Sequence, residues 1–253
     1  MPFQDHFSRL AQNYARSRPL YPSAIYQYLA GIAPGQGLAW DCATGNGQAA
    51  VALAEYFEQV AATDASAKQI EQAFPHPRVV YRVEPAETTS LAPGTVDLVT
   101  VGTAVHWFDF DGFYAEVQRV SRPGGILAVW TYFFPQIDPD VDALIDHLYW
   151  KVLNGYWPER IRYLENKYQT LPFPFAEIEP PPFVMEADWS LKQLLGFIAS
   201  WSGTQKYQEQ TGRQPIEVIM PDLGAAWGPE EQVRHIRWPL YFRIGRLPGM
   251  DAG

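Results

Sequence analysis

The stretch from Leu38 to Leu53 constrains the fold of this 253-residue chain more than any other part of its sequence. A short apolar run ends at an acid, Asp41, and a bend that contains Gly45 and Gly47 leads into an alanine-rich run. This order predicts a strand, a tight loop and a helix. Glycines remove side chains where a ligand approaches the backbone, and the first helical turn carries unpaired N–H groups. The loop is therefore the first candidate for a ligand site.

The rest of the chain alternates between apolar strands and helical segments, which is typical of an α/β fold. Strands such as 96–101 and 126–130 are almost wholly apolar, and such strands are usually buried on both faces of a parallel sheet. We therefore expect a Rossmann-like, doubly wound, mainly parallel seven-stranded sheet with helices on both faces. The expected strands are 38–42, 59–63, 79–83, 96–102, 126–132, 183–189 and 233–246, and the expected helices are 23–30, 48–57, 66–73, 110–120, 140–153 and 191–208.

Three kinds of nucleotide-binding loop can be compared with the glycine-rich bend. A phosphate-binding P-loop requires a lysine after its last glycine, where this chain has Gln48. A dinucleotide site requires Gly-x-Gly-x-x-Gly, whereas the small residues here are Ala43, Gly45 and Gly47. The pattern Asp-x-Ala-x-Gly-x-Gly instead resembles motif I of class I S-adenosylmethionine (SAM) methyltransferases, with Ala43 at the first glycine position. A glycine-rich turn that binds no ligand is the structural alternative.

Two further segments resemble the trans-aconitate methyltransferase-like group within this family. One is Tyr14-x-x-x-Arg18-Pro-x-Tyr21-Pro, and the other is Ala104-x-His106-Trp-Phe-Asp, which follows the fourth expected strand. By this resemblance the N-terminal segment covers SAM, and Arg18 faces a carboxylate of SAM or of the substrate. An arginine exposed in a proline-rich turn is the plain alternative for Arg18.

The resemblance also implies which residues bind SAM. Asp64 ends the second expected strand, where a carboxylate can accept hydrogen bonds from ribose hydroxyls; a place in a helix-start turn with Ser66 is the alternative. After the third strand, Pro85 stands where family members often carry a polar residue, which leaves adenine recognition to Ala86 and Glu87. The expected cofactor-binding residues are Tyr14, Arg18, Asp41, Ala43, Gly45, Gly47, Gln48, Asp64, Ala65, Ala86, Glu87 and Thr103.

Methyl transfer from a sulfonium is an in-line displacement, in which positioning and the exclusion of water supply most of the acceleration. A carboxylate acceptor requires no base, and the resemblance slightly favours such an acid. A hydroxyl or amine acceptor requires a base, for which His106 is the catalytic candidate. His106 as a helix cap, or packed on Trp107, is the alternative. The residues expected to face a small-molecule substrate are Tyr21, His106, Trp107, Trp157 and Trp201.

The resemblance predicts one methyltransferase domain over 1–253. Its expected parts are an N-terminal helical flap (1–36), a SAM-binding core (37–133), an insertion that contains the sixth strand and a helical substrate lid (134–232), and the last strand (233–246). A nicotinamide-dependent oxidoreductase on the same sheet and a SAM-binding protein without catalysis are the other hypotheses.

Charge and composition narrow the classes of partner. A net charge of −9 argues against nucleic acid, because phosphate contacts require clusters of Lys and Arg. The chain has no apolar run of 18 residues and its start lacks the form of a signal peptide, so we expect a cytoplasmic protein, monomeric or homodimeric, without a membrane partner. The single cysteine, Cys42, excludes an internal disulfide, and no metal site is expected from the scattered histidines.

Overall fold

The computed structural model describes residues 19–229 and 231–249. The first half of the expected N-terminal helical flap and two expected cofactor-binding residues, Tyr14 and Arg18, lie outside the described residues. The chain divides into two compact units. In the described residues, we call them the sheet unit (21–133, 162–184 and 239–249) and the helical unit (19–20, 134–161, 185–229 and 231–238).

An eight-stranded sheet in the order β3-β2-β1-β4-β5-β8-β6, with β7 also paired to β8, forms the centre of the fold. The strands β1 to β5 pair in parallel, and β8 lies antiparallel beside β5. This arrangement confirms the Rossmann-like, mainly parallel sheet that the apolar strands predict. The strands are β1 (Leu38–Cys42), β2 (Gln59–Asp64), β3 (Val79–Val83), β4 (Val96–Gly102), β5 (Ser121–Tyr132), β6 (Ala176–Glu177), β7 (Phe183–Ser190) and β8 (Val233–Arg246).

The predicted number of seven strands was too low by one, because β6 was not expected. This strand has only two residues, too few for a periodic pattern in the sequence. It pairs with the end of β8, and Glu177 in β6 accepts hydrogen bonds from Arg243 in β8. The seven expected strands all form.

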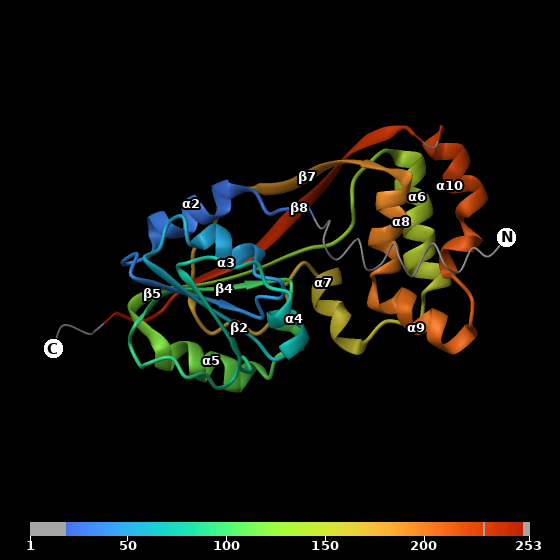
Figure 1. Ribbon diagram of the computed structural model, residues 1–253. Helices are drawn as coiled ribbons and strands as arrows, with labels where there is room; N and C mark the ends of the chain where they lie inside the picture. The colour runs from blue at the N-terminus through green and yellow to red at the C-terminus, as the bar shows by residue number, and fades with distance from the viewer. Residues whose placement is uncertain (1–18, 230, 250–253) are drawn as a thin grey trace. The chain divides into compact units, whose positions relative to one another are not determined.

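Helices cover both faces of the sheet within the sheet unit. The helices α2 (Ser23–Ile32) and α3 (Gln48–Leu53) lie on one face and α5 (Phe110–Val120) lies on the other, as Figure 1 shows. In α5 the buried residues Phe113, Val117 and Val120 recur at helical spacing and face the same hydrophobic core as Trp40. Two shorter helices, α4 (Ala67–Glu71) and α7 (Arg162–Glu165), complete the unit.

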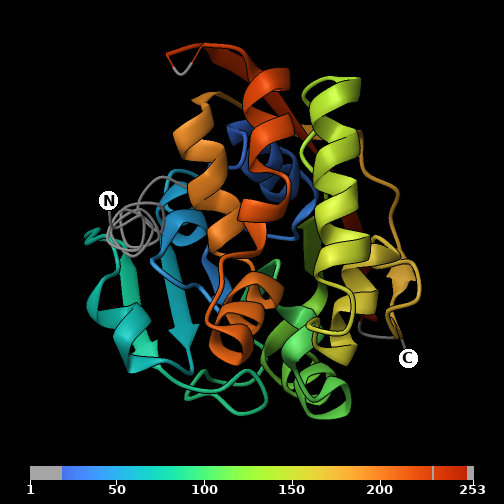
Figure 2. The same cartoon turned by 90° about the vertical axis from the view of Figure 1, so that its right-hand side faces the viewer.

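The helical unit contains α6 (Pro139–His147), α8 (Leu191–Ala199), α9 (Ser202–Thr211) and α10 (Met220–Trp227). Figures 1 and 2 show α6, α8 and α10 running alongside one another. The single helix expected over 191–208 is wrong, because Trp201 has an extended backbone (φ −66°, ψ 137°) that ends α8 and begins α9. The helix α10 was not expected; Gly224 lowers helix propensity at its centre, whereas Pro221 lies in the first turn, where proline is tolerated.

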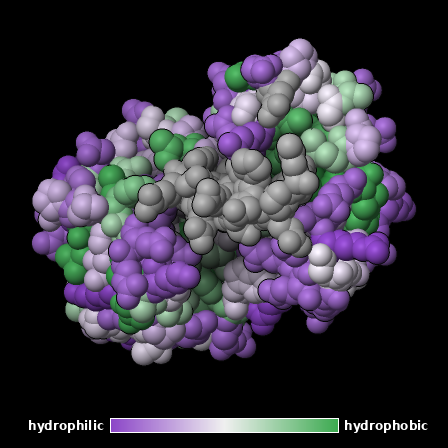
Figure 3. Space-filling model, turned by 45° about the vertical axis from the view of Figure 1, so that its right-hand side comes forward, coloured by the Kyte–Doolittle hydropathy of each residue, from purple (hydrophilic) through white to green (hydrophobic). Residues whose placement is uncertain are grey.

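The surface carries few large hydrophobic side chains in the part of the chain that the structure describes. On the face drawn in Figure 3, hydrophobic residues lie scattered among hydrophilic ones, which is ordinary for a protein surface. Between residues 19 and 249, with residue 230 set aside, no helix is long and apolar enough to cross a membrane. The exposed large hydrophobic residues are Leu20, Phe74, Val80, Val83, Trp107, Trp150, Val218 and Val233.

Candidate active site

The glycine-rich loop after β1 is joined to the end of β2 by the carboxylate of Asp64. The Gly45 N–H donates to Oδ2 of Asp64 (2.9 Å), and the Ser66 N–H donates to Oδ1 (2.8 Å). The turn between Asp64 and Ser66, which the sequence analysis gave as the alternative role of Asp64, is therefore present. Each carboxylate oxygen has a second lone pair, so these bonds leave Asp64 able to accept from ribose hydroxyls. That role stays a prediction.

Gly45 and Gly47 both have left-handed backbones but have different surroundings. Gly45 (φ 57°) has open space beside it among the residues that the structure describes, since a Cβ built there would have Gln69 Oε1 as its nearest neighbour, at 4.0 Å. A Cβ on Gly47 (φ 84°) would collide with the ring of Tyr81, which lies in β3. Gly47 is therefore required for packing, and Gly45 is the position that leaves room for a ligand. Gln48 begins α3, and Ala65 is exposed after β2.

Ala43 also has a left-handed backbone, with φ 54°. An L-residue with a Cβ pays about 1–2 kcal/mol in this region, which glycine avoids. The side-chain methyl group of Ala43, where the motif I pattern has glycine, therefore strains the backbone of the loop. Thr103 at the end of β4, the strand beside β1, has the same φ of 54°. Such strain concentrates at functional sites.

Ala43→Gly is expected to raise the free energy of unfolding by about 1 kcal/mol, because glycine adopts positive φ without steric cost. Chemical denaturation measures this change. Ala52→Gly is the matched control, since Ala52 lies inside α3 and its replacement should lower stability by roughly 0.5–1 kcal/mol. Equal destabilisation by both changes would show that Ala43 is not strained.

Asp41 is buried at the end of β1 and is held by two threonine hydroxyls. Thr44 Oγ1 donates to Oδ2 (2.5 Å), and Thr100 Oγ1 donates to Oδ1 (2.8 Å). Burial raises the pKa of Asp41 to about 6, although these hydrogen bonds act to lower it. The carboxylate is thus turned inward and ties the loop to β4. Contact between Asp41 and a cofactor stays a prediction.

The buried Asp41 makes stability depend on pH in a direction that can be tested. A raised folded-state pKa favours the protonated carboxyl, so its contribution is fully present below the unfolded value of 3.8 and is lost as pH rises through about 6. Each pKa unit corresponds to about 1.36 kcal/mol. The free energy of unfolding of the protein, relative to Asp41→Asn, should therefore fall by about 2 kcal/mol between about pH 4 and pH 7. Denaturation at several pH values measures it, and a flat difference would contradict it.

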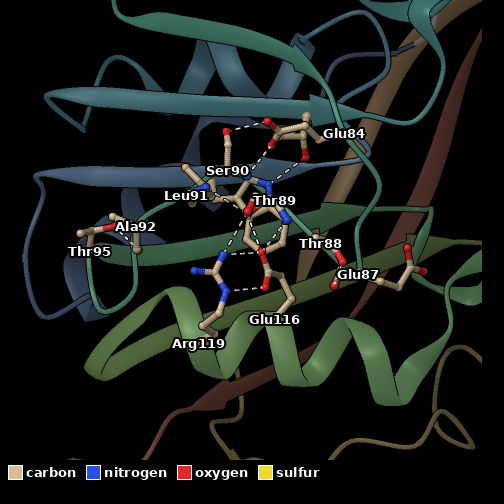
Figure 4. Close-up of polar contacts among 12 residues, drawn as sticks. Glu84, Glu87, Thr88, Thr89, Ser90, Leu91, Ala92, Thr95, Glu116 and Arg119 are labelled. Atoms are coloured by element: carbon tan, nitrogen blue, oxygen red, sulfur yellow. Dashed lines mark hydrogen bonds and ion pairs between the residues drawn. The ribbon is translucent and has the colours of Figure 1, made fainter.

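The loop after β3 carries the expected adenine residues and is tied to α5. Figure 4 shows Glu116 of α5 accepting hydrogen bonds from the N–H and hydroxyl of Thr89 (2.7 and 2.6 Å) and from Arg119 (2.7 Å). Burial acts to raise the pKa of Glu116, and these bonds outweigh it and lower the pKa. Glu87 accepts from the Asp109 N–H at the start of α5 (3.0 Å), and Ala86 is buried. The network fixes the loop, while the adenine contact stays a prediction.

Tyr21 and Thr103, which the sequence assigned to substrate and cofactor, lie together at the end of β4. Their hydroxyl oxygens are 3.2 Å apart, and the Thr103 N–H donates to the carbonyl of Trp130 (2.7 Å). The edge of the Tyr21 ring meets Trp130 at a centroid distance of 5.3 Å. These contacts hold the start of α2 against β4 and β5.

His106 lies in a short 3₁₀ turn, Val105–Trp107, directly after β4. Its side chain is buried (2% exposed), whereas half of the neighbouring Trp107 is exposed, with ring centroids 4.8 Å apart. Nδ1 of His106 is 2.9 Å from the hydroxyl of Tyr168. Sequence reasoning missed Tyr168, because it lies 62 positions away in a stretch without periodic pattern.

Trp157 and Trp201, the other residues expected to face the substrate, meet each other in the helical unit. Trp157 stacks on Tyr149 with a centroid distance of 4.2 Å, and Trp201 is 6.0 Å from both rings. Trp157 Nε1 donates to the carbonyl of Tyr149 (3.3 Å). The two tryptophans thus belong to one aromatic cluster, and their contact with substrate stays a prediction.

Comparison with known proteins identifies the family. A family model described as a methyltransferase domain matches residues 40–129, which run from β1 into β5. A solved protein of Anaeromyxobacter dehalogenans, described as a "putative type II methyltransferase", is 45% identical with a TM-score of 0.86. The match covers 92% of this chain and 99% of that one.

Two curated proteins give a similar result. A Dictyostelium discoideum protein, described as a "putative methyltransferase", is 29% identical over 96% of this chain and 95% of its own length. An Aspergillus candidus methyltransferase is 26% identical over 76% of this chain and 67% of its own length. Since the solved relative matches over nearly its whole length and the loop after β1 has the motif I form, the chain belongs to the class I methyltransferases, which use SAM as methyl donor.

Proposed function

We propose that this enzyme transfers the methyl group of SAM to a small molecule at the carboxyl ends of β1, β2 and β4. The observation that supports this proposal is the open space that the described residues leave beside Gly45, whose N–H donates to Asp64 at the end of β2. In a parallel sheet, ligands bind beyond the carboxyl ends of the strands. A loop without side-chain bulk beside an acid fits a nucleoside whose ribose presents two hydroxyl donors.

The residues of the sheet unit take separate roles in this proposal. Asp64 accepts from the ribose hydroxyls, and the loop of Ala86 and Glu87, fixed on α5 through Glu116, receives the adenine. SAM supplies a methyl group on a positively charged sulfur. Beyond β4, His106 and Trp107 face the acceptor, and Trp107 has the exposed apolar surface that a small-molecule pocket requires.

Two classes of methyl acceptor follow from this site. The resemblance to the trans-aconitate methyltransferase-like group favours a carboxylic acid, whose carboxylate needs no base. The buried His106 at the end of β4 favours instead an acceptor that must lose a proton. The net charge of −9 supports a small molecule over nucleic acid. Two further expectations stay proposals: that the helical unit acts as a substrate lid, and that the protein is cytoplasmic.

A product screen with isotopically labelled SAM tests the function. The panel contains carboxylic acids, phenols, alcohols and amines, and mass spectrometry detects products that gain one labelled methyl group. Gly45→Val is the control, because a branched side chain would fill the space beside the loop. We expect labelled product with the unmodified protein and none with the variant. SAM binding without any product across the panel would favour a SAM-binding protein without catalysis.

A further inference from the structure

The helix α9 begins without a side-chain cap. Its N-cap residue is Trp201, whose side chain makes no hydrogen bond to the first turn. In the part of the chain that the structure describes, the N–H groups of Ser202, Gly203 and Thr204 have no hydrogen-bond acceptor. The Gln205 N–H is the first to bond, to the Trp201 carbonyl (3.0 Å). Unpaired N–H groups at a helix start take side chains, water or ligands as partners, and they carry a partial positive charge.

The hydroxyl of Thr204 is a further donor without a partner at this turn. Its Oγ1 is buried and has no hydrogen bond within the described residues, and only 2% of Thr204 is exposed. A threonine inside a helix can donate to the carbonyl four residues earlier, which here belongs to Ser200, but this bond is absent. Because the Cα–Cβ bond of a helical residue tilts toward the helix N-terminus, the Thr204 side chain leans toward the uncapped N–H groups. A buried hydroxyl without a bond destabilises the folded chain, so it calls for a physical reason.

The indole ring of Trp157 lies against the same turn. A Cβ built on Gly203 would be only 2.8 Å from two atoms of this ring, so glycine alone lets the ring approach the helix so closely. Trp157 stacks on Tyr149, with ring centroids 4.2 Å apart, and its ring centroid is 6.0 Å from that of Trp201. Both tryptophans are partly exposed. The unpaired donors of α9 therefore adjoin a flat apolar surface that solvent reaches in part.

We propose that the first turn of α9 binds the carboxylate of an aromatic acid, whose ring lies against Trp157 and Trp201. The two oxygens of a carboxylate carry four lone pairs, enough for the N–H groups of the turn and the Thr204 hydroxyl. The partial positive charge at a helix start attracts an anion. Aromatic pairs gain more than their apolar area alone explains, which favours a flat ring as the body of the acid.

The residue types at the turn agree with a carboxylate ligand. The first turn of α9 contains no acidic residue, so no carboxylate of the turn itself competes with the ligand for the N–H groups. It contains no arginine or lysine either, the side chains on which phosphate sites generally rely. A phosphate group carries nearly two negative charges at pH 7, whereas a carboxylate carries one. The partial charge of a helix start is therefore better matched by a carboxylate.

This site lies within the helical unit and goes beyond the proposed methyl transfer. It holds whether or not the acid is also the methyl acceptor, because its donors and its aromatic surface need no SAM. The Thr204 hydroxyl is closed to solvent, so binding also requires a side chain beside the turn to move. The experiments below are made on the full chain without SAM, and their outcome is independent of the product screen.

NMR of the Gly203 amide tests the site directly. Ser202-Gly203 is the one Ser-Gly pair in the sequence, so carbon-13 at serine carbonyls and nitrogen-15 at glycine give a single carbonyl–amide correlation, that of Gly203. Benzoate, phenylacetate and cinnamate are the titrants, with their uncharged amides as controls. We expect at least one acid to move this signal in a saturable manner and its amide to leave it in place. No shift with any of the acids, or an equal shift with the amides or with inorganic phosphate, would overturn the proposal.

Thr204→Val tests the buried hydroxyl, because valine keeps the shape of threonine without its donor. Calorimetric titration with the acid that moves the Gly203 signal most should show a Kd raised roughly tenfold or more, since a hydrogen bond to a charged group is lost. Without the acid, this variant should unfold at an equal or higher denaturant concentration than the unmodified protein, because an unpaired buried hydroxyl is removed.

Thr211→Val is the matched control. Thr211 lies in the last turn of the same helix, and its hydroxyl donates to the Tyr207 carbonyl (2.8 Å). This variant should bind the acid as the unmodified protein does. Equal affinity in the unmodified protein and in both variants would overturn the proposal. If Thr204→Val does not fold, the Gly203 signal of the unmodified protein still decides.

Discussion

His106→Gln is expected to lower kcat by roughly 10²–10⁴-fold for an acceptor that loses a proton, the usual range of general-base catalysis. Gln is close in size to His and retains hydrogen-bonding atoms, but it cannot take up a proton at neutral pH. Steady-state kinetics with a protic acceptor measure this change. For a carboxylate acceptor the same replacement should mainly raise KM, since no proton leaves.

Trp107→Ala tests whether the turn Val105–Trp107 acts in the chemistry or only positions the acceptor. Trp107 is next to His106 but is half exposed and has no group that transfers protons. Its loss should raise KM in either case, because it removes an apolar surface beside the acceptor. Unchanged kinetics in both variants would show that the turn after β4 is outside the active site.

Asp64→Ala is expected to weaken SAM binding by about 1.5–3 kcal/mol, or roughly 10- to 150-fold in Kd, because hydrogen bonds to a charged group are lost. The replacement also frees the Gly45 N–H, so the loop loses its anchor on β2. Calorimetric titration of SAM measures the change, and circular dichroism verifies that the variant is folded.

Asp97→Ala is the matched control for Asp64→Ala. Asp97 lies near the start of β4 and also accepts backbone hydrogen bonds, from the N–H groups of Gly37 (2.9 Å) and Leu38 (3.0 Å). It lies at the amino ends of the parallel strands and not at the carboxyl ends where SAM is proposed to bind, so its replacement should leave SAM affinity unchanged. An equal loss of affinity in both variants would mean that general loosening, and not Asp64 itself, weakens binding.

Most of the sheet could be predicted from the sequence because its strands are buried. A parallel strand covered on both faces is mostly apolar, and β4 over 98–101, apart from Thr100, and β5 over 126–130 have this pattern. The break between α8 and α9 was missed although Ser200, Ser202 and Gly203, which favour caps and turns over helix interiors, flank Trp201. The short β6 depends on pairing with β8, which a local pattern does not encode.

The candidate site was predictable in its residues but only partly in their contacts. Gly45 and Gly47 look equivalent in the sequence, and only the ring of Tyr81 distinguishes packing at Gly47 from open space at Gly45. The carboxylate of Asp41 is buried against two threonines, which its position in the motif did not predict, and its contact with a ligand stays a prediction. The contact between Tyr168 and His106 joins two positions that are 62 residues apart in the sequence. Such contacts follow from tertiary packing and leave no local signal.

The central claim is that the loop joined to Asp64 binds SAM, and calorimetric titration of SAM into the unmodified protein tests it most directly. NAD, the cofactor of the competing oxidoreductase hypothesis, serves as the parallel titrant. The predicted result is saturable heat with one SAM bound per chain and no saturable heat with NAD. Absence of saturable SAM binding to the folded protein, or binding of NAD in its place, would contradict the claim.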